Sequence, residues 1–276
     1  MSAADKIFIE NCEHILQNGI SDEGQNVRPR WNDGTPAHTL RVFGLVNSYD
    51  LSEEFPALTL RRLSFKNCVD EILWIYQKKS NRVCDLNSKI WDAWADKNGT
   101  IGKAYGFQLG IKHKYAEGEF DQIDRVIFDL KNNPSSRRII TNMYNHQDLH
   151  EMSLYPCAYG LTFNVAEGKL NAILNQRSQD FLTANNWNVC QYSALIHMFA
   201  AACDLRAGKL LHVIADAHIY DRHIPVIKKI IRNEPRDAPI FKINSEKKNF
   251  YEFEVADFSL EKYFPHKFSD EIEVAI

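Results

Sequence analysis

The sequence predicts an α+β protein in which helices pack on one large, mainly buried mixed sheet. Two observations carry this prediction. Several long stretches repeat apolar residues at helical spacing, and β-branched or alternating stretches lie among them without a strict strand–helix order. The 276 residues contain no repeat, low-complexity tract or linker rich in proline, glycine and serine. We therefore expect residues 1–276 to form a single domain.

Helices are expected wherever apolar residues recur every three or four positions. In "SFKNCVDEILWIYQKK" this spacing gives one apolar face, and "FDQIDRVIFDLKNN" repeats the pattern before a proline ends it. The stretch "VCQYSALIHMFAAACDL" is apolar on nearly every side, which is typical of a central buried helix. The predicted helices are 5–18, 64–79, 120–133, 189–205 and 224–234.

Strands are expected in the stretches between and after these helices. "RRIITNMY" is rich in β-branched residues, and "YGLTFNV" places every second apolar side chain on one side. Similar patterns follow in the second half of the sequence. The predicted strands are 137–144, 159–165, 169–178, 209–215, 239–243 and 251–255.

Composition excludes several classes of function. The 33 basic and 36 acidic side chains leave a net charge of −3, so nothing global recruits nucleic acid or an anionic membrane. The first residues lack the pattern of a signal peptide, and no apolar run is long enough to cross a bilayer. Six cysteines form no C-x-x-C pair and no zinc-like cluster. We expect a reduced, cytoplasmic protein without a metal, a membrane or a required nucleic acid.

Cys157 stands out among the six cysteines because it follows a proline in "MSLYPCAYG". Proline fixes the backbone before the thiol. A nucleophilic cysteine also needs a nearby positive charge or base, and Arg137, Arg138, Arg177 and His218 are candidates. On position alone, a buried structural cysteine is the more frequent case.

The order of the motifs changes that balance. "DEILWIYQKKSN", "IWDAWADKNGTIGKAYGFQ" and "DQIDRVIFDLKNNPSSRR" precede "LYPCAYG", and "NQRSQDFLTANNWNVCQYSAL", "ADAHIYDRH" and a terminal "EIEVAI" follow it. This series resembles the folate-dependent thymidylate synthase family in content, order and spacing, from about residue 19 to the end. Each fragment alone is a weak signal, whereas seven in order are specific.

The resemblance implies a single-domain thymidylate-synthase-like fold that forms a homodimer through its sheet. It also implies the reductive methylation of dUMP to dTMP, a methyltransferase reaction within nucleotide biosynthesis. The co-substrate would be 5,10-methylenetetrahydrofolate, which gives the one-carbon unit and the hydride and leaves as dihydrofolate. Cys157 would add to C6 of the uracil ring, because C5 is a poor nucleophile without that covalent step.

The resemblance also assigns roles to individual residues. Beside Cys157, the catalytic set would be Glu71, which organises proton transfer, Tyr105, which assists removal of the C5 proton, and Asn188, which hydrogen-bonds to the uracil edge. Arg137 and Arg138 would come from the neighbouring subunit, and His218 and Tyr220 would hold the deoxyribose. The remaining substrate-binding residues would be Arg28, Gln176, Arg177, Ser178, Gln179, Asp180 and Ile219. Folate would contact Trp91, Trp94, Asp180 and Ala275, with Ile276 closing over it and Asn81 near Glu71.

Several of these residues also allow a purely structural interpretation. Asn188 could cap the helix that follows, Glu71 could lie on a helix edge, and the arginine pair could be a solvated turn. The N-terminal loop "VRPRWNDGTPAHTL" departs from the usual family pattern, so Arg28 is preferred and Arg30 is its rival. Other departures concern folate affinity and loop geometry: Ser64, Ala158, Ala184, Gln191 and Ala215.

Three other functions are alternatives to this one. A deoxypyrimidylate hydroxymethylase would use the same cysteine and folate but capture water in place of hydride; Asn188 argues against its cytosine version. A nucleotide- or RNA-binding protein without catalysis predicts loss of Cys157, Glu71 or Tyr105, and all three are present. A cysteine hydrolase lacks an oriented Cys/His/Asn signature.

Overall fold

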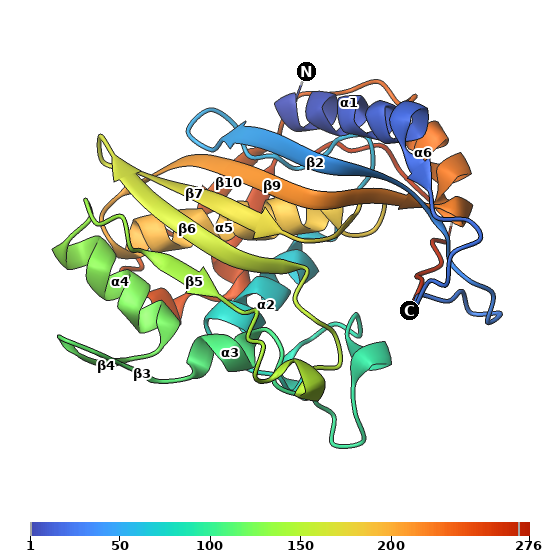
Figure 1. The fold of residues 1–276 in the computed structure, drawn as a ribbon. Coiled ribbons are helices and arrows are strands. Elements are labelled where there is room, and N and C mark those ends of the chain that lie inside the picture. The colour runs from blue at the N-terminus through green and yellow to red at the C-terminus, as the bar shows by residue number, and fades with distance from the viewer. Residues whose placement is uncertain (1, 270) are drawn as a thin grey trace.

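The computed structural model describes residues 2–269 and 271–276. A seven-stranded mixed sheet runs through the molecule in the order β1-β2-β9-β7-β6-β5, with β8 paired to β9 (Figure 1). Its neighbours are antiparallel except at β7–β9 and β8–β9, which are parallel. The strands of this sheet are β1 Ile20–Ser21, β2 Thr39–Asp50, β5 Ile140–Asn142, β6 Ala158–Ala166, β7 Lys169–Gln176, β8 Gln179–Asp180 and β9 Arg206–Tyr220.

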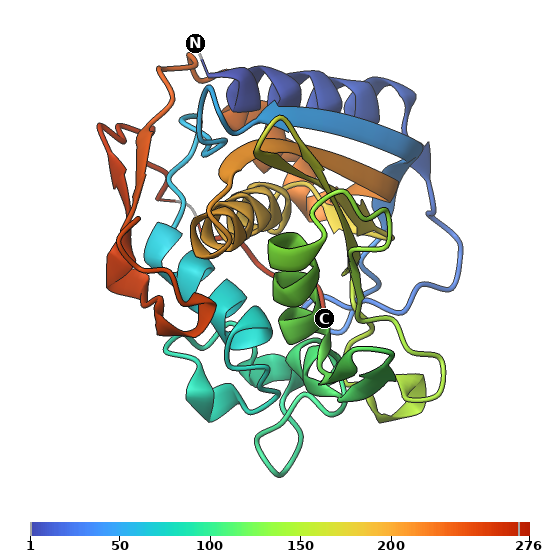
Figure 2. The same cartoon turned by 90° about the vertical axis from the view of Figure 1, so that its left-hand side faces the viewer.

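The helices gather mainly on one face of this sheet. Helix α5 packs against β7 and β9 and is covered by α2, while α1 packs against β2 and β9. Figure 2 shows α5 inside the molecule, between the sheet and the cyan helix α2. Burial on nearly every side explains why the α5 sequence is apolar all round. The α-helices are α1 Ala3–Asn18, α2 Phe65–Tyr76, α3 Gly106–Gly110, α4 Gln122–Asn132, α5 Asn185–Ala202 and α6 Ile224–Ile230.

Two small antiparallel pairs complete the strands: β3 His113–Tyr115 with β4 Gly118–Phe120, and β10 Ile240–Ile243 with β11 Phe258–Glu261. The α+β class and all five predicted helices are confirmed. The strand predicted at 251–255 is wrong. Two 3₁₀ turns occupy that stretch, Phe250–Glu252 and Val255–Asp257, because the side chain of Asn249 caps the first and Glu254 and Asp257 form a capping box around the second.

The 12-residue strand β2 was missed by the sequence pattern. Gly44 has φ +79 and interrupts the alternation, so Phe43 and Val46, three positions apart, are both exposed. This finding also corrects the expectation of a mainly buried sheet. The face opposite the helices is open within one chain: Phe43 is 92% and Val46 61% exposed, and Ile173 and Ile140 are exposed on β7 and β5.

Candidate active site

Cys157 lies in the turn that leads into β6, directly before Ala158. Antiparallel pairing places Ala158 opposite Gln176, the last residue of β7. The next residue, Arg177, donates its backbone N–H to the Cys157 carbonyl over 2.9 Å. The pairing of two strand ends therefore brings together a thiol and an arginine that are 20 positions apart.

The Arg177 guanidinium contacts three consecutive residues of the turn that carries the thiol. Its Nη2 lies 3.7 Å from the Cys157 Sγ and donates to the Tyr155 carbonyl over 2.7 Å. Its Nε donates to the Pro156 carbonyl over 3.0 Å. Burial raises the pKa of Cys157, and the charge of Arg177 acts in the opposite direction by favouring the thiolate.

Tyr105 approaches the same turn from the start of α3. Its hydroxyl accepts the Cys157 backbone N–H over 3.1 Å, and its buried ring meets Trp91 edge-on at 5.2 Å between centroids. Burial raises the pKa of Tyr105 well above its ordinary value. The residue has φ +47, a conformation that L side chains rarely adopt, and such strain is common at functional sites.

Glu71 is buried on α2 and is not a helix-edge surface residue. Its carboxylate accepts hydrogen bonds from Trp91 Nε1 over 2.6 Å, from Gln191 Nε2 over 2.7 Å and from Trp187 Nε1. Burial raises the pKa of Glu71 and these three donors oppose the shift. Trp187 and Gln191 were not predicted as site residues. Asn81, expected near Glu71, donates instead to the Gly102 carbonyl over 2.6 Å.

Asn188 lies in the first turn of α5 and does not cap the helix, whose N-cap residue is Ala184. Its Oδ1 accepts from Gln176 Nε2 over 3.2 Å and from Gln179 Nε2 over 3.4 Å. Its Nδ2 donates to Gln191 Oε1 over 3.1 Å. The half-buried amide is therefore held from both sides by other amides.

The C-terminal end of β9 carries the predicted sugar-binding pair. The His218 and Tyr220 rings meet edge-on at 5.2 Å, as their spacing along an extended strand predicts. The His218 Nδ1 lies 2.8 Å from an Asp216 carboxylate oxygen. Ile219, between them, is fully buried in the core. Burial and the charge of Asp180 raise the pKa of Tyr220, while Arg28 opposes that shift.

Asp180 organises the turn that precedes α5. Its carboxylate accepts from the backbone N–H of Leu182 over 2.8 Å and from the Thr183 hydroxyl over 2.5 Å. Ser178 lies just before β8, where its carbonyl accepts from Gln176 Nε2 over 3.0 Å. On the opposite side of the site, Trp94 packs against Trp91 at 5.5 Å.

The C-terminus is joined to the N-terminal loop. Arg30 and Ile276 exchange two backbone hydrogen bonds of 2.8 and 3.0 Å, next to Ala275 (Figure 1). The Arg30 guanidinium turns back onto its own loop and donates to the carbonyls of Val27 and Pro29. The charge of Arg28, by contrast, lowers the pKa of Cys157. Arg28 is therefore the loop arginine whose charge acts on the thiol.

Arg137 and Arg138 are not among the residues that contact Cys157. Both are exposed in the turn before β5, and within the described residues neither makes an ion pair. The fold thus gathers the predicted residues from α2, α3, α5 and the ends of β6, β7 and β9, and leaves this arginine pair apart.

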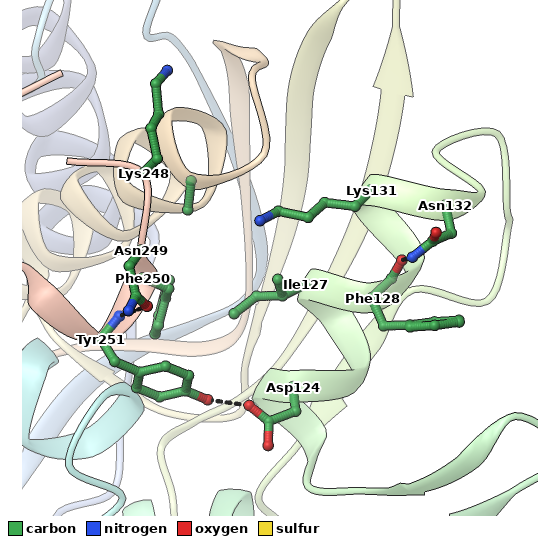
Figure 3. A pocket seen from close by; sticks show the side chains of 10 residues that line it. Asp124, Ile127, Phe128, Lys131, Asn132, Lys248, Asn249, Phe250 and Tyr251 are labelled. Atoms are coloured by element: carbon green, nitrogen blue, oxygen red, sulfur yellow. Dashed lines mark hydrogen bonds between the residues drawn. The ribbon is translucent and has the colours of Figure 1, made fainter. Parts of the chain in front are cut away.

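A separate hollow of about 390 Å³ lies beside α4 and includes none of the predicted site residues. Figure 3 shows Tyr251 donating to Asp124 across it, over 2.5 Å, with Lys131 and Lys248 above them. Among the described residues, no group of three or more His, Cys, Asp or Glu side chains is arranged to hold a metal ion. No described helix has the length and apolarity needed to cross a membrane.

A thiol beside a guanidinium, with a buried carboxylate and flat aromatic rings nearby, is a grouping typical of an enzyme site for a flat, anionic substrate. Comparison with known proteins gives the family. The family model described as "Thymidylate synthase" matches residues 6–276. Thymidylate synthase 1 of Bacillus spizizenii is 44% identical over the full length of both chains. Thymidylate synthase of Bacillus phage phi3T is 44% identical over 95% of this chain and 96% of the phage protein.

Solved structures agree with these relatives. The thermostable thymidylate synthase A from Bacillus subtilis superposes with a TM-score of 0.94 at 42% identity and covers 99% of both chains. The chain belongs to the thymidylate synthase family. It is a methyltransferase that converts dUMP to dTMP, so the function and the fold inferred from the motifs are confirmed.

Proposed function

We propose that Cys157 is the nucleophile of this reaction and that its thiolate adds to C6 of the dUMP uracil ring. The addition makes C5 a carbon nucleophile, which uracil alone does not provide. The observation that carries the assignment is the Arg177 guanidinium, whose Nη2 lies 3.7 Å from the Cys157 Sγ. A positive charge at this distance stabilises the thiolate against the effect of burial.

The substrate phosphate is bound by arginines, since a guanidinium matches a phosphate dianion in charge and shape. Arg177 and Ser178 serve it from the end of β7, and Arg28 serves it from the N-terminal loop. Arg28 is preferred to Arg30 because the charge of Arg28 opposes the rise in the pKa of the Cys157 thiol, whereas the Arg30 guanidinium donates to carbonyls of its own loop. Arg177 and Arg28 are thus the two arginines whose charges act on the Cys157 thiol.

The two ends of the nucleoside are held by different elements. Asn188 hydrogen-bonds to the uracil edge, where an amide supplies both a donor and an acceptor. Gln176 and Gln179 hold that amide from behind. His218 and Tyr220 bind the 3′-hydroxyl of deoxyribose, while the Ile219 side chain between them packs into the core.

The residues around Trp91 fit a reduced folate. The Trp94 indole N–H is buried with no hydrogen-bond partner among the described residues, so a polar ligand would satisfy it. The two indole rings offer stacking area, Asp180 offers a carboxylate, and Ala275 lies in the tail that closes over the ligand. The bound folate supplies the one-carbon unit and the hydride. Glu71 and Tyr105 hold and move the protons at the pyrimidine.

We also propose a homodimer formed by the open sheet face. Cross-strand pairing aligns Val46 with Val213, and Ile173 with Leu211, so apolar side chains cover adjacent strands of this face. Ile140 continues the face onto β5, and the unpaired arginines directly precede that strand. A second copy on this face would bring Arg137 and Arg138 of the partner subunit to the phosphate.

The reaction is tested with dUMP and methylenetetrahydrofolate by following the absorbance of dihydrofolate, with Cys157→Ser as the control. Dihydrofolate formed by the wild type and not by the variant supports both the reaction and the nucleophile. Exchange of the dUMP C5 hydrogen with solvent without dihydrofolate would instead indicate a hydroxymethylase. Absence of both signals would overturn the proposal.

The dimer is tested by mixing two inactive variants, Cys157→Ser and Arg138→Ala, under conditions that exchange subunits. If Arg138 serves the neighbouring site, a mixed dimer contains one site with both native residues, and activity returns. The same mixture of Cys157→Ser with Arg177→Ala regains nothing, because both of these residues belong to one chain's site. Equal failure of both mixtures would contradict the shared site.

A further inference from the structure

A line of side-chain hydrogen bonds, here called the amide network, crosses the site from β9 to α2. His212 Nε2 lies 2.8 Å from Gln176 Oε1, and Gln176 Nε2 donates to Asn188 Oδ1 over 3.2 Å. Asn188 Nδ2 donates to Gln191 Oε1 over 3.1 Å, and Gln191 Nε2 donates to Glu71 Oε2 over 2.7 Å. All members are buried except Asn188, which is half-buried.

The donors of the amide network all point in one direction, toward Glu71. Its carboxylate receives three N–H donors and acts as an acceptor, so Gln191 must turn its Nε2 to Glu71 and its Oε1 to Asn188. Asn188 must then turn its Nδ2 to Gln191. At the other end, Gln176 also donates to the Ser178 carbonyl, which fixes the Gln176 amide in the same sense.

We propose that Gln191 is a positioning residue that fixes the amide orientation of Asn188 and so sets the preference of the site for uracil over cytosine. The inference rests on the proposed role of Asn188 at the pyrimidine edge. Uracil presents an N3–H donor and an O4 acceptor, whereas cytosine presents an N3 acceptor and an N4 amino donor. An amide fixed in one orientation matches one of these patterns, and an amide free to rotate matches both.

A merely structural role for Gln191 predicts a different result. Gln191 also donates to the Cys68 carbonyl over 3.4 Å and fills space between α5 and α2. If these contacts were its whole function, losing them would weaken stability and affect both nucleotides equally. The ratio of the two affinities separates the alternatives, because packing does not distinguish uracil from cytosine.

The experiment measures the Kd values of dUMP and dCMP by isothermal titration calorimetry for the wild type and Gln191→Met. Methionine has a similar length and forms no such hydrogen bonds, so Asn188 loses its constraint on one side. We expect the preference for dUMP over dCMP to fall by about tenfold, the effect of one hydrogen bond. A preference unchanged within about twofold would overturn the inference.

Ser193→Ala is the matched control. Ser193 lies on the same helix and is equally buried. Its hydroxyl donates a hydrogen bond to the Val189 carbonyl, outside the amide network. Its loss should leave the dUMP preference unchanged; an equal fall in this control would overturn the specific role of Gln191. If Gln191→Met does not fold, Gln191→Leu serves, because leucine also offers no acceptor to the Asn188 amide.

Two further outcomes keep the inference apart from the proposed function. A wild type that binds dCMP as tightly as dUMP overturns the role of Asn188, and the inference fails with it. If neither variant folds, the side-chain amide NMR signals of Asn188 in the wild type decide. Nuclear Overhauser contacts of the Asn188 Nδ2 protons with the Gln191 side chain support the fixed orientation, and contacts with the Gln176 amide in their place overturn it.

Discussion

Cys157 and Cys190 lie in surroundings that favour different thiol reactivity. Cys190 lies on α5 in the core, and its Sγ faces the Pro56 carbonyl at 3.6 Å and Asn186 Oδ1 at 3.7 Å. Burial raises the pKa of Cys190, with only a weak hydrogen bond opposing it. Burial raises the pKa of Cys157 too, but there the Arg177 charge opposes it. Cys157 is also partly exposed whereas Cys190 is fully buried, so a nearby cation and access to solvent together distinguish the two thiols.

The strongest test of this comparison replaces each thiol in turn. Cys157→Ser should lower kcat by about 10⁴-fold or more, because a hydroxyl at neutral pH is a far weaker nucleophile than a thiolate. Cys190→Ala should keep kcat within about twofold, since no charge acts on that thiol. Dihydrofolate formation measures both. Substantial activity in Cys157→Ser would remove the basis for the comparison.

Removing the cation should make Cys157 resemble Cys190. In Arg177→Gln, burial acts without its main opponent, so the pKa of Cys157 rises and less thiolate is present at neutral pH. Alkylation of Cys157 by iodoacetamide should slow, and the midpoint of its rate against pH should move to higher pH. The value of kcat/KM should fall by about 10²-fold or more.

Two variants control this pH profile. Arg177→Lys keeps a positive charge without the planar fork, so its alkylation midpoint should move less than that of Arg177→Gln. Arg30→Gln should not move it, because the Arg30 guanidinium is bonded to the carbonyls of Val27 and Pro29. A midpoint that stays in place in Arg177→Gln would show that the charge does not control the thiol.

These two cysteines also show what sequence alone could predict. Local motifs around Cys157 and Arg177 predicted the thiol that we propose as the nucleophile, because their order along the chain is specific to a family. Glu71 was assigned through the family resemblance, and it is buried on α2. The partners of that carboxylate were not predicted. Trp187 and Gln191 lie 116 and 120 positions away, and only the packing of α5 on α2 brings them together.

The errors in the fold have local physical causes. Strand β2 was missed because a positive-φ glycine interrupts its alternation. The residues 251–255 alternate like a strand, yet side-chain capping by Asn249, Glu254 and Asp257 favours tight turns. Pattern analysis uses one periodicity at a time, so a positive-φ glycine conceals a strand and a capped turn imitates one.

A smaller effect is expected from the second group near the thiol. Tyr105→Phe removes the hydroxyl that accepts the Cys157 backbone N–H and leaves the ring beside Trp91. We expect kcat to fall by about tenfold to 10²-fold, because both the turn and the proton transfer depend on that hydroxyl. The alkylation midpoint should rise less than in Arg177→Gln. Full activity in Tyr105→Phe would limit the role of Tyr105 to packing.

The smallest effect on activity, and a clear effect on stability, is expected at Cys190. Its side chain is fully buried on α5, so Cys190→Ala leaves a small cavity and should lower the free energy of unfolding by about 1–2 kcal/mol. Urea denaturation measures that change, and iodoacetamide should leave the native Cys190 unmodified. Rapid alkylation of Cys190 in the folded protein would contradict the comparison, because it would show that a buried thiol without a cation is reactive.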